Sequence, residues 1–198
     1  DEFLIVNGTL NATDVFNLYQ LSEGRYRWIV NVTDGSLTNG SDVRTFTLNT
    51  PPNVTAATLT PAVANTTNQL TCTFTPEELV DTSVTCTVNF YNSTLTSETS
   101  SASYTPNAQN TKTATSGVQA KLESWTCGIQ CSDQLSTGQQ VNSSSITIVN
   151  SPPNTPTLTD PSNHAVTTDT TPAFIWTGND PDNDALNYTL NITTIEST

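Results

Sequence analysis

The stretch that decides the fold spans residues 21–35 and reads LSEGRYRWIVNVTDG. Aromatic and apolar side chains occupy alternate positions of its centre, which are Tyr26, Trp28, Val30 and Val32. Polar side chains such as Arg25 and Arg27 stand between them. A period of two predicts a β-strand with one buried face. The Asp34-Gly35 pair that follows predicts a turn.

This stretch resembles a late strand of a known domain class. Leu-x-x-Gly before Tyr26, then Trp28, then Asp34-Gly35 resemble strand F and the tyrosine corner of immunoglobulin-like and fibronectin type III-like β-sandwiches. Such a sandwich takes about 100 residues, yet this strand begins only about 25 residues into the chain. The first strands of the domain are therefore expected elsewhere.

Residues 151–198 carry what the resemblance requires of those first strands. They include Phe174-Ile175-Trp176 and, after an acidic loop, the strand-like run 188–193. Residues 1–50 and 151–198 together provide 98 positions, about one domain. We therefore expect three parts. Residues 1–50 form the C-terminal half of a fibronectin III-like sandwich, 51–150 a complete immunoglobulin-like sandwich, and 151–198 an N-terminal half that residues 1–50 of the next copy complete.

A repeated linker supports these boundaries. Asn49-Thr50-Pro51-Pro52-Asn53 recurs as Asn150-Ser151-Pro152-Pro153-Asn154, one domain length later. Di-proline stiffens a chain and stops strand pairing across a junction. A repeat at this distance indicates a tandem array of domains.

The composition favours strands. The chain has 198 residues, of which 40 are Thr and 19 are Ser. Thr, Val, Ile and aromatic residues suit exposed pleated strands, and no window has sustained helical apolar spacing. We expect an all-β protein of antiparallel immunoglobulin-like and fibronectin type III-like sandwiches with almost no helix.

Taken together, these features resemble the tandem immunoglobulin-like and fibronectin type III-like repeats of prokaryotic, archaeal-looking cell-surface and extracellular filament proteins. The resemblance extends to the cysteines, because Leu70-Thr71-Cys72 and Trp125-Thr126-Cys127 look like the inter-sheet disulfide of immunoglobulin domains. It implies the pairs Cys72–Cys127 and, between the neighbouring strands C and F, Cys86–Cys131. A four-cysteine zinc site and free thiols remain as alternatives. Disulfides imply an oxidising compartment outside the cytoplasm.

Sequons for N-glycosylation are frequent. Ten of the 21 Asn residues precede x-Ser or x-Thr: Asn7, Asn11, Asn31, Asn39, Asn53, Asn65, Asn92, Asn142, Asn187 and Asn191. The number is little above chance, but most of the positions fall in loops or on the polar side of predicted strands. We expect them to carry N-glycans; unmodified polar surface is the alternative.

The acidic loop at residues 178–184 is a candidate metal site. Asp180, Asp182 and Asp184 alternate along it, and Ca²⁺ takes six to eight oxygen ligands. Asp34 and Asp42 are expected to approach this loop once the two half-domains meet. The alternative is a solvated acidic turn that binds no ion.

Charge and composition exclude several function classes. The net charge is −13 and there are only five basic residues, so we expect neither nucleic acid nor an anionic membrane as a partner. The sequence contains no apolar run of 18 residues, so we expect no segment that inserts into a bilayer. His164 is the single histidine, and no Gly-x-Ser-x-Gly motif accompanies it, so we expect no enzymatic activity.

The resulting hypothesis is a structural unit of a glycosylated extracellular filament or cell-surface stalk. Identical copies would join head to tail, either as separate chains that complete each other's sandwiches or as covalently linked repeats. The alternatives are an adhesin or ligand-binding module of a cell-surface protein and a viral fibre.

Overall fold

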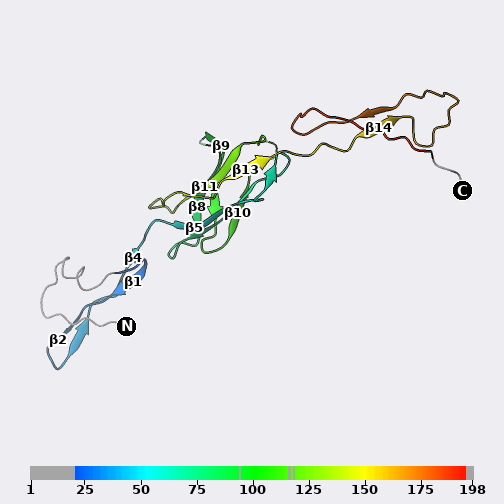
Figure 1. Ribbon diagram of the computed structural model, residues 1–198. Helices are drawn as coiled ribbons and strands as arrows, with labels where there is room; N and C mark the ends of the chain where they lie inside the picture. Colours follow the sequence, from blue (N-terminus) through cyan, green and yellow to red (C-terminus); the bar gives the residue numbers. More distant parts are fainter. Residues whose placement is uncertain (1–20, 94, 116, 118, 195–198) are drawn as a thin grey trace.

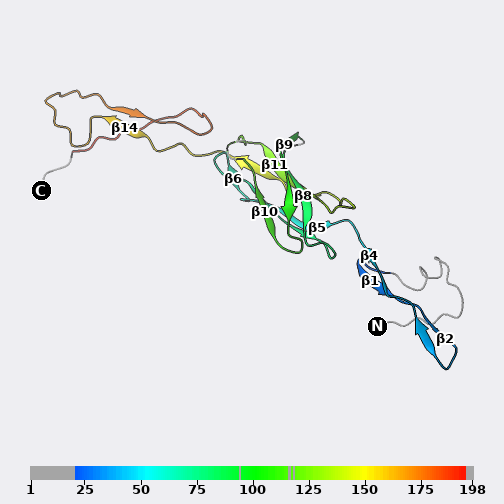
Figure 2. The same cartoon turned by 180° about the vertical axis from the view of Figure 1, so that it is seen from behind.

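The computed structural model describes residues 21–93, 95–115, 117 and 119–194, and every regular element in this part of the chain is a β-strand. The expected all-β class without helix is confirmed for these residues. The strands form three groups along an elongated molecule (Figures 1 and 2). We call them the N-terminal segment (residues 21–48), the middle segment (53–149) and the C-terminal segment (155–194).

The N-terminal segment is a long hairpin of four strands: β1 (Gly24–Trp28), β2 (Asn31–Thr33), β3 (Thr38–Gly40) and β4 (Arg44–Leu48). β1 pairs antiparallel with β4, and β2 pairs antiparallel with β3. The Asp34-Gly35 turn joins β2 to β3 as predicted. The Asp34 carboxylate accepts the N–H groups of Ser36 and Leu37, each at 2.9 Å, and Gly35 adopts a φ of 92° that favours glycine.

The single strand predicted around Trp28 is broken in two, which corrects the sequence analysis. Trp28 lies opposite Arg44 and Asn31 lies opposite Gly40, so the second arm of the hairpin holds one extra residue between these pairs. Ser41 fills the gap: its Oγ accepts the Val30 N–H at 2.9 Å, and its own N–H donates to the Val30 carbonyl at 2.7 Å. An extra residue of this kind acts as a β-bulge and bends the ribbon.

The middle segment contains two sheets. Its strands are β5 (Asn53–Thr60), β6 (Ala64–Asn65), β7 (Thr71–Glu77), β8 (Val84–Asn92), β9 (Leu95–Tyr104), β10 (Asn110–Thr113), β11 (Ser124–Ser132), β12 (Val141–Asn142) and β13 (Ile146–Val149). One sheet has the order β10-β7-β5. The other has the order β6-β13-β11-β8-β9, with β12 also on β11, and it is mixed because β6 runs parallel to β13.

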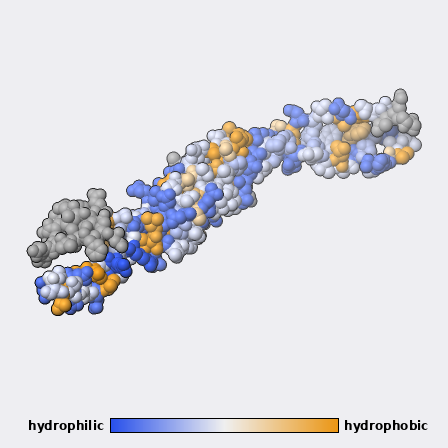
Figure 3. Space-filling model, turned by 90° about the horizontal axis from the view of Figure 1, so that it is seen from below, coloured by the Kyte–Doolittle hydropathy of each residue, from blue (hydrophilic) through white to orange (hydrophobic). Residues whose placement is uncertain are grey.

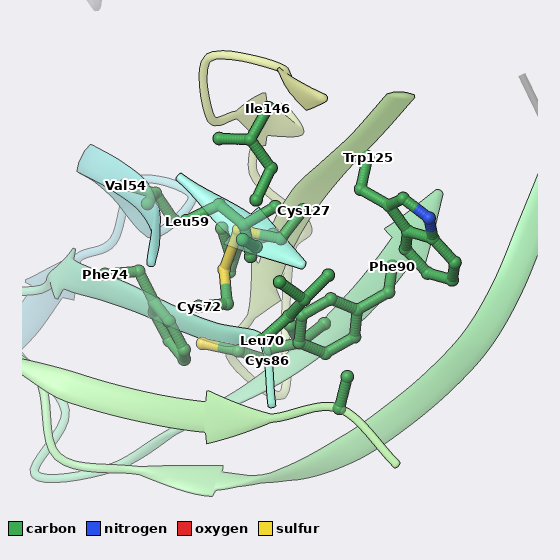
Figure 4. Close-up of a cluster of buried hydrophobic side chains, with 14 of the residues drawn as sticks. Val54, Leu59, Leu70, Cys72, Phe74, Cys86, Phe90, Trp125, Cys127 and Ile146 are labelled. Carbon is green, nitrogen blue, oxygen red and sulfur yellow. A yellow bond between two sulfur atoms is a disulfide. The ribbon is translucent and has the colours of Figure 1, made fainter. Parts of the chain in front are cut away.

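Both sheets contribute to one hydrophobic core. Alternate residues of β7 and β8 are buried, as their period-two sequences require, and Trp125 of β11 is fully buried (Figure 4). Within the described residues, every buried hydrophobic side chain lies between Pro52 and Ile148. The packed core of the molecule therefore belongs to the middle segment.

Two disulfides reinforce this core, in the pairing that the resemblance implied. Cys72 of β7 is bonded to Cys127 of β11 and connects the two sheets (Figure 4). Cys86 and Cys131 lie directly opposite each other on β8 and β11 and are also bonded. No cysteine is left for the alternative zinc site or for free thiols.

The C-terminal segment contains two short strands, β14 (Thr157–Asp160) and β15 (Ile175–Thr177), which pair antiparallel. The strand predicted at Phe174-Ile175-Trp176 is thus present. Residues 188–193, which the sequence predicts as a strand, form none. A strand needs a neighbour with which to exchange backbone hydrogen bonds, and this run forms no ladder with any described strand, although the Tyr188 ring packs against Trp176 of β15.

The indole of Trp125 illustrates how buried polar groups are satisfied in the core. Its Nε1 donates to Glu123 at 2.9 Å, and Glu123 also accepts from the Asn92 side chain at 2.6 Å and from the Ala120 N–H at 2.7 Å. Burial alone would raise the pKa of Glu123, but these three donors more than offset it, and the pKa lies below its ordinary value.

Glu123→Gln is expected to lower the free energy of unfolding by about 1–3 kcal/mol near pH 7, because an amide cannot accept all three donors. Since the folded-state pKa is depressed, the contribution of Glu123 is present above the ordinary pKa and is lost as the pH falls through the folded-state value. Chemical denaturation at several pH values should show the difference between the wild type and the variant shrinking as the pH falls below the ordinary pKa of a glutamate. The exposed Glu77→Gln is the control; a constant difference at every pH would contradict the prediction.

Candidate functional site

The first junction, between the N-terminal and middle segments, is built around Asn49-Thr50-Pro51-Pro52. The Asn49 side-chain amide donates to Asp133 at 2.7 Å, and the Thr50 hydroxyl donates to Glu23 at 2.7 Å. Pro52 is fully buried, and its carbonyl approaches Gly138 so closely that a Cβ there would clash with the carbonyl oxygen. Polar contacts and a close backbone approach therefore hold the first linker on the middle segment.

The second junction, between the middle and C-terminal segments, uses the predicted acidic loop. Asp182 accepts the Ser151 N–H at 2.6 Å and pairs with the Thr66 hydroxyl. Asp184 forms a salt bridge with Lys121, each side chain being a little over one third exposed. The acidic loop thus fastens the second Pro-Pro linker, just as carboxylates fasten the first.

The charges of the second junction stabilise one another. Hydrogen bonds from Thr66 and then from the Ser151 backbone lower the pKa of Asp182, with a smaller effect of Lys121. The hydrogen bond with Asp184 and the nearby negative charges raise the pKa of Lys121. Lys121 is therefore the positive charge that faces this acidic loop.

The structure brings the predicted metal ligands together. One carboxylate oxygen from each of Asp180, Asp182 and Asp184 lies within 4.8 Å of the others. Asp180 is buried, so the alternative of a wholly solvated turn does not describe this loop. Asp182 and Asp184 are already engaged by Thr66, Ser151 and Lys121, so the Lys121 ammonium would compete with a bound cation. Calcium binding here stays a prediction.

The proposed approach of Asp34 and Asp42 to this loop concerns a neighbouring copy. Within one chain, both residues belong to the N-terminal segment, which the middle segment separates from the C-terminal segment that carries the acidic loop (Figure 1). Their meeting with Asp180 would therefore need the half-domains of two copies to pair.

Most sequon asparagines of the described residues face solvent. Six are exposed: Asn31, Asn39, Asn53, Asn142, Asn187 and Asn191. Asn65 and Asn92 are half-buried, and the Asn92 amide is engaged by Glu123 at 2.6 Å. Asn7 and Asn11 lie outside the described residues. Glycan attachment is sterically open at the six exposed positions and would cost Asn92 its hydrogen bond.

Both terminal segments expose the apolar faces that their sequences predict as buried. In the N-terminal hairpin, Trp28 is 49% exposed and Val32 is 68% exposed, although Tyr26 stacks on Phe46 with ring centroids 5.2 Å apart. In the C-terminal segment, Ile175 and Leu190 are about half exposed. Apolar surface is visible on both ends of the molecule in Figure 3. These faces are the surfaces most suited to binding a partner.

The sequence analysis missed the acidic residues of the first junction, above all Glu78. The buried positions of β7 are Cys72, Phe74 and Pro76, and the same period of two leads directly to Glu78. Glu78 could have been identified as a site residue from the sequence, because it places a carboxylate at the next inward-facing position after this strand.

The chain matches no protein-family model and no curated protein. Among the residues whose positions the structure describes, no helix is long and apolar enough to cross a membrane.

Proposed function

We propose that this chain is a structural unit of a glycosylated extracellular filament or cell-surface stalk. Its copies join head to tail. The N-terminal segment of one copy and the C-terminal segment of the next complete one immunoglobulin-like or fibronectin type III-like β-sandwich. The middle segment is the complete sandwich between two such joints.

The observation that carries this proposal is the pair of exposed apolar faces. In the middle segment, alternating sequences are buried between two sheets, whereas the same kind of alternation around Trp28 leaves that residue 49% exposed. Residues 188–193 have the composition of a strand but form no ladder with a described strand. Among the described residues, the N-terminal hairpin thus lacks a second apolar layer and residues 188–193 lack backbone partners, and each segment would supply what the other lacks.

Local geometry favours a sandwich as the completed unit. The Tyr26 hydroxyl donates to the Ser22 carbonyl at 2.5 Å, four residues upstream, which is the hydrogen bond of a tyrosine corner. In the C-terminal segment, the rings of Trp176 and Tyr188 meet edge to face at 5.7 Å, as an early part of a sandwich core would require.

The remaining features suit an extracellular structural role. Two disulfides favour folding outside the cytoplasm, and six exposed sequons give sites for glycans. The terminal segments lie at opposite ends of an elongated molecule, so contacts between unlike ends extend a chain of copies instead of closing a dimer (Figures 1 and 2).

Trp28→Asp is expected to weaken self-association of the full chain about thirtyfold or more, because a large aromatic side chain would lie at the centre of the joint. Sedimentation velocity over a range of concentrations measures this effect. The wild-type chain should form a series of oligomers, and the variant should remain a monomer at the same concentrations.

Thr45→Asp is the matched control. It adds the same charge to the same hairpin, but Thr45 pairs with Arg27 on the opposite face. It should associate like the wild type. A wild-type chain that stays monomeric at high concentration, or equal losses in both variants, would contradict head-to-tail completion through this face.

A further inference from the structure

The first junction gathers carboxylates from both sides of the linker. One oxygen from each of Glu78, Asp81 and Asp133 lies within 4.8 Å of the others, all three in the middle segment. The carboxylate of Glu23, from the N-terminal segment, lies against that of Glu78. Four acidic side chains thus converge where two segments meet.

Glu78 is the centre of this group. It is only 3% exposed, and its Oε1 accepts the N–H groups of Leu79 and Val80, each at 2.9 Å. Its other oxygen, Oε2, is buried and accepts no hydrogen bond from the described part of the chain. In Glu23, Oε2 accepts from Thr50, while Oε1 is buried and has no donor among the same residues. A buried carboxylate oxygen without a donor is costly unless something positive binds it.

The described residues provide no positive side chain for this purpose. The one salt bridge among them joins Lys121 to Asp184, at the second junction. Neutral donors also hold Asp133, which accepts from Asn49 at 2.7 Å and from the backbone of Leu135 at 2.7 Å, whereas Asp81 is exposed. These hydrogen bonds position the carboxylates of Glu23, Glu78 and Asp133 and leave their charge uncompensated.

We propose that the first junction binds a divalent cation, Ca²⁺, through Glu78, Asp81 and Asp133 of the middle segment and Glu23 of the N-terminal segment. The chemistry of the donors selects the ion. All of them are carboxylates, which suit hard cations, whereas zinc and copper sites are built with nitrogen or sulfur. Ca²⁺ accepts several carboxylates in irregular geometry, whereas Mg²⁺ demands a near-ideal octahedron and keeps most of its waters.

The position of the ion defines its role. Its ligands come from both sides of Pro51-Pro52, so it ties the N-terminal hairpin to the middle segment and fixes their relative orientation. This role does not depend on how copies associate. In a filament, it would stiffen each chain at one junction, while Lys121 pairs with Asp184 at the other.

The test uses the full chain, stripped with EDTA and titrated with CaCl₂. Ligand binding to the folded state should raise the unfolding midpoint with calcium concentration. We expect half-saturation at about 10⁻⁴–10⁻³ M, typical of extracellular calcium modules. Amide hydrogen exchange should slow at Thr50 and at residues 78–81 when calcium is added. An equal concentration of MgCl₂ should have a much smaller effect.

Glu78→Gln and its neighbour Glu77→Gln form a matched pair. Both remove one negative charge at adjacent positions, but Glu77 is exposed and lies outside the cluster. Glu78→Gln should weaken calcium binding about tenfold or more, and Glu77→Gln should leave it unchanged. Asp81→Asn, at an exposed position, is a second variant that should weaken binding without disturbing the fold. In the variant Asp184→Asn, at the other junction, calcium should still slow amide hydrogen exchange at residues 78–81.

Two results would overturn the proposal. If millimolar calcium changes neither the unfolding midpoint nor the exchange at the first junction, a proton shared between Glu23 and Glu78 compensates the charge instead. If Glu78→Gln, Asp81→Asn and Glu77→Gln all respond to calcium like the wild type, calcium binds elsewhere on this acidic chain.

Discussion

Replacing Cys72 and Cys127 together with alanine is expected to lower the free energy of unfolding of the middle segment by about 4 kcal/mol. The two residues are separated by 55 positions, and their bond limits the conformations of the unfolded chain. In the folded state the bond connects the two sheets across the core, where both cysteines are fully buried. Denaturant unfolding followed by Trp125 fluorescence measures the loss.

Removing the second disulfide, Cys86–Cys131, provides a comparison for the loss of stability. It closes a loop of similar length, with a separation of 45, so the same argument predicts a loss of about 4 kcal/mol. This bond lies within one sheet, where β8 and β11 already pair over eight residues. Local hydrogen exchange should therefore increase between the sheets only in the Cys72/Cys127 variant. A loss well under 1 kcal/mol for either pair would contradict the stabilising role assigned to that bond.

The second large effect is expected in a rearranged chain. A circular permutant that begins at Pro51, runs to Thr198 and continues directly with Asp1 through Thr50 contains the same 198 residues in a new order. It joins residues 151–198 to residues 1–50 in one polypeptide. If these halves form one sandwich, the permutant gains a second folded domain with a stability of about 5–15 kcal/mol. It should also be a monomer, because its complementary faces meet within one chain.

Much of this fold follows from local sequence pattern. The alternation at Cys72 and Phe74 and the alternation along β8 each predict one buried face, and the structure buries it. Strands β9 and β10 escaped prediction because their Ser- and Thr-rich sequences, as at residues 97–103, give no apolar alternation. β9 forms because β8 offers it a full set of backbone partners.

The other differences arise from tertiary contacts that a local pattern does not encode. The break after Trp28 depends on Ser41, eleven residues beyond Val30. Residues 188–193 form no strand because they make no ladder with any described strand. The acidic loop was recognised from the spacing of its aspartates, but its partners Thr66 and Lys121 are far away in the sequence.

The most direct test of head-to-tail completion is amide hydrogen exchange of residues 21–48 and 171–193, compared between the natural chain at low concentration and the circular permutant. The account predicts that exchange in both ranges slows by a factor of about 10³ or more in the permutant, with Trp28 and Trp176 becoming buried. Equal exchange rates in the two chains, with protection confined to the middle segment, would show that the terminal segments are not halves of one domain.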